Sequence, residues 1–273
     1  MLLRGLAVAA SGFLFIFSPG LPIGLLARRG LPLKRDLLYW GAGLWLVMLL
    51  PSLFIQSLLR QILWRGQGPG NISGQLVDYP FTLLGAFITA VIVQGAMYLL
   101  LRRRRLDSSA LPSSGLSLGF GVGLIAQVFT GLSLVGAGFR LVYGDTSTPT
   151  LASLAQMGYL SLILGLLPLI LFRPALLVIS AVQGVLVGRA LRERAYFFWL
   201  AVLIGTLFTW LILALEMALG SQNPGQVLLG VTDPRTSLVA ILYYGLAFGL
   251  AFRWLHGQIT IWGKVSSKKI KEK

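Results

Sequence analysis

Long apolar stretches, separated by short polar segments, fix the environment in which this chain can fold. A helix that crosses a membrane needs about 20 mostly apolar residues. Segments that meet this requirement cover residues 3–27, 37–60, 80–101, 115–139, 154–172, 174–190, 195–219 and 237–255. Only 11% of the 273 residues are charged, against about 25% in a typical soluble domain. We therefore expect an all-α, polytopic integral membrane bundle with eight hydrophobic segments, of which seven or eight are full spans.

The chain divides into a membrane domain and a short tail. Residues 1–255 form the predicted single transmembrane helical domain, and residues 256–273 form a basic cytoplasmic tail. The first apolar segment begins like a signal peptide but lacks a small-x-small cleavage site after it, so we interpret it as a retained helix. Pro19 and Pro22 are expected to kink or break this helix.

The distribution of basic residues predicts the orientation. Cytoplasmic loops of membrane proteins are rich in Lys and Arg. The loops after the first and third segments carry Arg28, Arg29, Lys34 and Arg35, and then the run from Arg102 to Arg105. Both loops are therefore predicted to be cytoplasmic and the N-terminus to lie outside, with the bacterial cytoplasmic membrane as the expected location.

The second half of the chain conflicts with this orientation. Strict alternation through eight spans would place both the arginines of residues 189–194 and the C-terminal tail outside, although their charge favours the cytoplasm. The conflict disappears if residues 154–190 cross the membrane once in net terms, as a full span plus a re-entrant segment that turns at Arg173–Pro174. These residues are too many for one straight helix at about 1.5 Å per residue in a core of about 30 Å. The topology of this segment stays open.

The net charge of +15 raises the possibility of nucleic-acid binding, and its pattern argues against it. The basic residues form short runs between apolar segments and do not follow one amphipathic helix or a soluble arm. Anionic lipid headgroups attract such runs. We expect membrane lipids and other membrane subunits as partners, and no nucleic acid.

Few side chains in this sequence could perform acid–base or metal chemistry. The chain has no cysteine, one histidine and eight acidic residues, which excludes disulfides and thiolate metal sites. We predict no catalytic residue, no metal ligand and no cofactor. Glu216 is the one isolated intramembrane acid; it either reaches the interface or pairs with an arginine, or it is a functional carboxylate. His256 is a boundary residue or, alternatively, a haem or pigment ligand.

Three amides lie near the middle of predicted spans. An amide in hydrocarbon seeks a partner on a neighbouring helix, and Gln94, Gln127 and Gln183 are therefore predicted to form one inter-helix cluster. The alternatives are isolated helix-to-helix bonds or a polar pocket for a ligand or lipid headgroup.

Glycines that recur four residues apart predict close helix packing, because this spacing puts them on one helix face. They are Gly115, Gly119 and Gly123, then Gly184 and Gly188, and finally Gly245 and Gly249. A nucleotide-binding loop at residues 119–123 is excluded, since that motif follows a soluble strand.

The order of these segments resembles the YhfC family, predicted intramembrane metalloproteases that are related to the CAAX-protease-like and PrsW-like membrane proteins. The similarity covers most of the chain and is carried by residues 21–29, 40–45, 90–98 with the arginines that follow, and 119–123. It implies a helical membrane fold with a metal centre.

The family's chemical residues are absent at the matching positions. Val93 and Gln94 stand at its Glu-Glu pair and Met97 at its Arg, while Leu124 stands at its His and Gln127 or Val128 at its glutamate. A zinc site with three protein ligands and a general base cannot be assembled from these residues. The resemblance therefore implies a pseudoenzyme.

Three hypotheses of function follow. The first is a non-catalytic scaffold or accessory subunit of a membrane complex. The second is a transporter or a small-molecule or lipid-binding component, with helices broken at residues 19–22 and 167–168 that expose backbone groups to a ligand. The third is an intramembrane protease with unorthodox residues, in which the catalytic groups are either displaced or built around Glu216.

Overall fold

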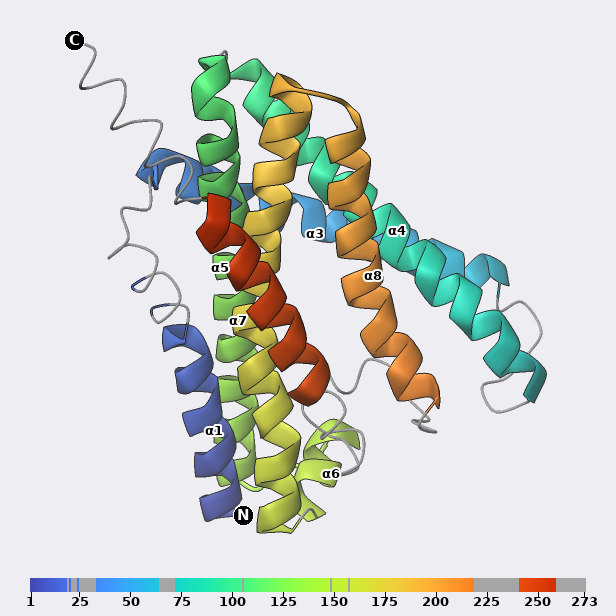
Figure 1. Ribbon diagram of the computed structural model, residues 1–273. Helices are drawn as coiled ribbons and strands as arrows, with labels where there is room; N and C mark the ends of the chain where they lie inside the picture. Colours follow the sequence, from blue (N-terminus) through green and yellow to red (C-terminus); the bar gives the residue numbers. More distant parts are fainter. Residues whose placement is uncertain are drawn as a thin grey trace.

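A computed structural model of the chain describes residues 1–18, 20, 24, 33–63, 72–104, 106–147, 149–156, 158–218 and 241–258 (Figure 1). All regular secondary structure in these residues is helical, which confirms the all-α prediction. The helices are α1 (Leu2–Phe17), α3 (Arg35–Leu63), α4 (Ile72–Arg103), the 3-10 turn η1 (Ser108–Ala110), α5 (Leu111–Val142), α6 (Pro149–Gln156), α7 (Tyr159–Arg192) and α8 (Tyr196–Ala218). Residues 241–258 form a last helix, red in Figure 1.

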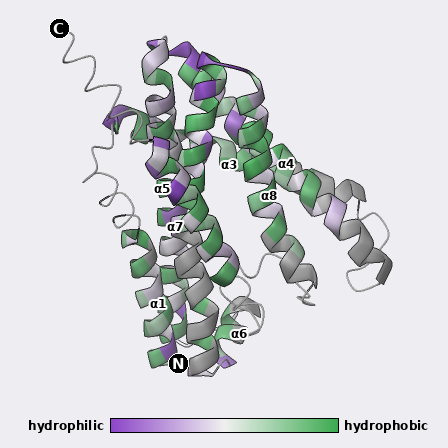
Figure 2. Cartoon of the chain, in the orientation of Figure 1, coloured by the Kyte–Doolittle hydropathy of each residue, from purple (hydrophilic) through white to green (hydrophobic). Residues whose placement is uncertain are grey.

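Three helical stretches among the described residues are long and apolar enough to cross a membrane. They are Thr82–Arg103, Ser108–Val142 and Pro174–Arg192, and Leu2–Leu14 and Tyr196–Leu211 are shorter apolar helices. Figure 2 shows hydrophobic residues along the shafts of these helices and hydrophilic residues gathered at the upper end of the bundle. These features are compatible with a membrane protein, and the count of eight segments stays a prediction.

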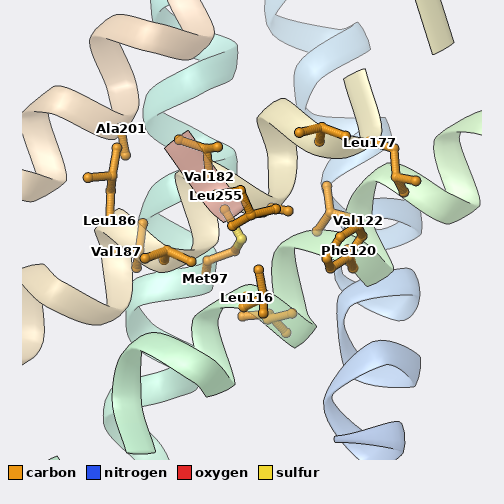
Figure 3. Close-up of a cluster of buried hydrophobic side chains, with 14 of the residues drawn as sticks. Met97, Leu116, Phe120, Val122, Leu177, Val182, Leu186, Val187, Ala201 and Leu255 are labelled. Carbon is orange, nitrogen blue, oxygen red and sulfur yellow. The ribbon is translucent and has the colours of Figure 1, made fainter. Parts of the chain in front are cut away.

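Helix α5 is the centre of the bundle. Helix α7 packs antiparallel along its first half, α1 along its second half, and α3 runs across it (Figure 1). The main apolar core lies where α3, α5 and α7 meet α4, α8 and the last helix (Figure 3). It includes Met97, Leu116, Phe120, Leu177, Leu186, Ala201 and Leu255. A second cluster joins α1, α5, α6 and α7 around Val8, Leu134 and Leu154.

Helix α7 is continuous for 34 residues. It therefore contains neither the re-entrant turn at Arg173–Pro174, which was one of the topologies left open, nor the break expected at residues 167–168 under the transporter hypothesis. Packed membrane helices tolerate proline because neighbouring groups compensate for the lost hydrogen bond. At about 1.5 Å per residue the helix is about 50 Å long and exceeds a hydrocarbon core of about 30 Å. It therefore reaches from one end of the bundle to the other in a single passage.

Helix α1 ends at Phe17, with Ser18 as its C-cap. Pro19 and Pro22, where the sequence predicted a kink or a break, lie outside the described residues. The last helix continues to residue 258, so His256 lies within a helix and the remaining tail, 259–273, lies outside the described residues.

Candidate functional site

The predicted glycine faces of α5 and α7 lie against each other. A Cβ atom at Gly115 would collide with the carbonyl of Gly184, and one at Gly119 with the carbonyl of Ser180. Gly123 faces Leu177, and Gly188 faces the backbone of Leu111 and Pro112 at the start of α5. The two backbones are in direct contact over this length, which is the arrangement that small residues permit in membrane helices.

Three further glycine contacts were not predicted from the sequence. Gly5 and Gly12 of α1 lie against Gly138 and Gly131 of α5. These pairs are seven residues apart in each helix, whereas the glycines of the predicted faces recur every four residues. Gly41 of α3 likewise meets Gly121 of α5, and an isolated glycine carries no spacing signal at all.

The third predicted glycine face differs from the other two. Gly245 and Gly249 lie on the last helix, and a Cβ atom at either position would meet no atom within 4 Å among the described residues. The leucines beside them, Leu242, Leu246 and Leu250, are all more than 60% exposed. This face, which we call the outer glycine face (Leu242, Gly245, Leu246, Gly249 and Leu250), has the same spacing as the faces of α5 and α7 but an open surface.

The three glutamines are buried, as their positions suggested, but their described hydrogen bonds lead to different helices. Gln183 of α7 donates from Nε2 to the carbonyl oxygen of Ala201 in α8, at 3.2 Å. Gln127 of α5 donates to the Oγ of Ser18, at the end of α1. Each bond ties two helices together, which is the simpler of the alternatives considered for these amides.

Gln94 is the third buried glutamine. Its side chain is 1% exposed, and its Oε1 has no hydrogen-bond partner among the described residues. It lies on α4, which packs against α8 and α7.

One end of the bundle collects most of the described basic residues; we call it the basic end. The end of α7 lies beside the start of α5 at Gly188, and Arg189 donates to Gln258 of the last helix. The start of α3 belongs to the same end, because Asp36 pairs with Arg104 at 3.2 Å. The basic residues of these segments are Lys34, Arg35, Arg102, Arg103, Arg104, Arg189, Arg192, Arg194 and Arg253.

Polar contacts tie the basic end together. The backbone N–H of Lys34 donates to Ser117 Oγ at 2.9 Å, and its Nζ donates to Ser114 Oγ at 3.3 Å. Both serines are fully buried in α5. The guanidinium of Arg104 also lies over the ring of Trp40, 5.0 Å from its centroid, a cation–π contact. Lys34, the residue before α3, is thereby anchored to α5, and Arg104, directly after α4, anchors the start of α3.

The opposite end carries fewer charges and holds the N-terminus. Arg4 donates to the carbonyl oxygen of Ala155 and lies over the ring of Tyr159. After α5 ends, Asp145 accepts a hydrogen bond from the backbone N–H of Ser147 at 2.9 Å and one from Arg140 Nε at 2.7 Å. The Ser147 hydrogen bonds, followed by that of Arg140, lower the pKa of Asp145 from 3.8 to about 2.

The candidate groups for chemistry are dispersed. The structure describes the backbone of Glu216 in α8, but its side chain lies outside the described residues. His256 is partly buried in the last helix. Among the described residues, no group of three or more His, Cys, Asp or Glu side chains could hold a metal ion. Met97 is fully buried in the main apolar core. The resemblance implies a functional arginine at this position. Val93 and Leu124 also pack against this core.

Two grooves flank the end of α4. One, of about 360 Å³, lies between α4 and α8; its walls are Gly95, Tyr98, Leu99, Ala195, Phe198 and Trp199. The other, of about 460 Å³, lies between α3 and α4; its walls are Trp40, Leu44, Met48, Ala96, Leu99, Leu100, Arg103 and Arg104. We call them the aromatic groove and the arginine groove.

Comparisons with models of protein families, with curated proteins and with solved structures find no match for this chain.

Proposed function

We propose that this chain is an integral membrane protein that acts as a non-catalytic scaffold or accessory subunit of a larger membrane complex. The observation that carries the proposal is the outer glycine face. Inside the bundle the same four-residue spacing brings α5 and α7 into backbone contact. On the last helix it faces outward and is open among the described residues. Small residues flanked by leucines form the interfaces through which membrane helices associate.

The proposed partner is therefore a transmembrane helix with a complementary small-residue face. Helix α4 adds a second apolar surface, since only 22% of its membrane stretch is buried, against 72% for the stretch in α7. The chain resembles the YhfC family but lacks that family's chemical residues at the matching positions. This is consistent with a helical fold that assembles with other proteins and does not cleave them.

The proposed orientation places the basic end in the cytoplasm. Because α7 makes one passage, the start of α5 and the turn at residues 193–195 lie at the same end, together with the end of the last helix. This arrangement supports an orientation with the N-terminus outside and the C-terminus inside, in keeping with the positive-inside rule. The bacterial cytoplasmic membrane stays the proposed location. It also removes the conflict that strict alternation through eight spans creates.

Co-migration in a mild detergent tests the proposal. We expect the wild-type chain, extracted from its native membrane, to migrate with partner chains. The double substitution Gly245→Leu and Gly249→Leu should release it as a smaller species, because leucine prevents close approach of a second helix. Gly136→Leu is the matched control, since Gly136 of α5 is also open to at least 4 Å. A wild-type chain that migrates as a stable lone monomer would contradict the proposal.

A further inference from the structure

The arginine groove is chemically divided along its length. On α3, Trp40, Leu44 and Met48 are four residues apart and form one wall. On α4, Ala96, Leu99 and Leu100 form the facing wall one to two turns before Arg103 and Arg104. At about 1.5 Å per residue, the α3 wall from Trp40 to Met48 is about 12 Å long, and the facing side from Ala96 to Arg104 has the same length. The groove therefore has apolar walls along most of its length and guanidinium groups at one end only, which we call its mouth.

The two arginines at its mouth differ in their pairing. Arg104 is held by Asp36 at 3.2 Å and by the ring of Trp40. Arg103 is exposed and has no acidic partner among the described residues. Asp36 thus offsets the charge of Arg104, whereas no described acid offsets the charge of Arg103. This end of the groove therefore keeps a net positive charge next to the apolar walls.

We propose that the arginine groove binds one anionic phospholipid of the bilayer, with its phosphate on Arg103 and an acyl chain along the α3 and α4 walls. A guanidinium presents a fork of donors that matches phosphate oxygens, and basic pockets between membrane helices on the cytoplasmic side select anionic headgroups. Trp40 and its partner Arg104 lie at the charged end of the groove, where the phosphate would bind. This site rests on the proposed membrane orientation, since the basic end must lie at a lipid headgroup layer.

The aromatic groove provides an internal comparison. It lies on the other side of α4, at a similar distance from the basic end, and shares the ridge residue Leu99. Its described walls are apolar or aromatic and carry no charged side chain. It can accept an acyl chain, but its walls offer nothing that distinguishes an anionic from a zwitterionic headgroup.

Fluorescence quenching in vesicles tests the site, and the absence of cysteine makes specific labelling direct. Met48→Cys places a bimane label in the arginine groove. Gly95→Cys places it in the aromatic groove, where an added side chain meets open space. Each labelled protein is reconstituted in vesicles that contain either brominated phosphatidylglycerol or brominated phosphatidylcholine as a minor component.

At Met48→Cys we expect brominated phosphatidylglycerol to bind about fivefold more tightly than brominated phosphatidylcholine, the effect of one basic residue near a lipid surface. At Gly95→Cys the two lipids should quench equally. Adding Arg103→Gln should abolish the preference at Met48→Cys, whereas Arg192→Gln, an exposed arginine of α7 at the same end, should leave it intact.

Equal quenching by the two lipids at Met48→Cys would overturn the proposal, as would a preference that survives Arg103→Gln. Competition by soluble glycerol phosphate as effective as that by the whole lipid would show a headgroup site without a chain and would also overturn it. Failure of both lipids to quench at both positions would instead contradict the membrane placement, and the lipid site with it. Loss of the scaffold role in the co-migration experiment would leave the quenching result unaffected.

Discussion

Two glycine faces with the same spacing have opposite surroundings in this molecule. Gly115 and Gly119 of α5 touch the backbone of α7 so closely that neither can accept a Cβ atom, whereas Gly245 and Gly249 of the last helix face open space among the described residues. The four-residue spacing of glycines therefore indicates only that another helix can pack closely against this face. The identity of that second helix depends on the rest of the sequence. In one region the partner is in the same chain, and in the other we infer a separate one.

The largest expected effect comes from filling the occupied face. Gly115→Leu should lower the free energy of unfolding by about 3 kcal/mol or more, because the new side chain would force α5 away from the Gly184 carbonyl. Gly245→Leu should produce no loss of stability in the same detergent. Chemical or thermal unfolding of the two variants measures the difference, and equal destabilisation would contradict the contrast between the faces.

A smaller effect is expected from shortening leucines in the two regions. Leu177 is fully buried beside Gly123, whereas Leu246 is 65% exposed on the outer glycine face. Leu177→Ala should reduce stability by about 2 to 4 kcal/mol through the cavity that it leaves. Leu246→Ala should change the stability of the isolated chain by less than about 0.5 kcal/mol, and unfolding in detergent compares them. A large loss for Leu246→Ala would show that this face is covered within the chain.

The glutamine bonds should contribute less than the glycine contacts. Gln183→Leu removes the hydrogen bond from α7 to Ala201 of α8, and the average inter-helix bond of this kind is worth about 0.6 kcal/mol. Thr206→Val is the control, because the Thr206 hydroxyl bonds within its own helix, to Val202. The unfolding midpoints of the wild type and of Thr206→Val should be higher than that of Gln183→Leu. The reverse order would show that Gln183 does not stabilise the contact between α7 and α8.

The smallest effect concerns the turn after α5. The pKa of Asp145 is lowered to about 2 in the folded chain from 3.8. Its contribution to stability is therefore present above about pH 4 and is lost as the pH falls toward 2. Asp145→Asn should make the melting midpoint slightly less dependent on pH in this window and leave it unchanged between pH 5 and 7. If the melting midpoint of Asp145→Asn depends on pH as much as that of the wild type, ionisation of Asp145 does not contribute to stability.

The sequence predicted local properties well and the pairing of helices poorly. The helical class and the glycine faces of α5 and α7 follow from composition and from a spacing within one helix. The contact of Gly5 and Gly12 with α5 was missed because its seven-residue spacing was not considered. The turn at Arg173–Pro174, one of the topologies left open, does not form: proline often breaks an isolated helix, whereas α7 packs on α5 and is continuous. The partners of Gln127 and Gln183 depend on which helices meet, and no single segment encodes that.

The passage of α7 from one end of the bundle to the other supports both the orientation and the lipid site. Labelling of single cysteines in intact cells with a membrane-impermeant maleimide tests it most directly, using the exposed positions Ser108→Cys, Ser147→Cys and Ala195→Cys. We predict that Ser147→Cys is labelled from outside, while Ser108→Cys and Ala195→Cys are labelled only after permeabilisation. Labelling of Ala195→Cys from outside, with Ser108→Cys protected, would contradict the single passage of α7.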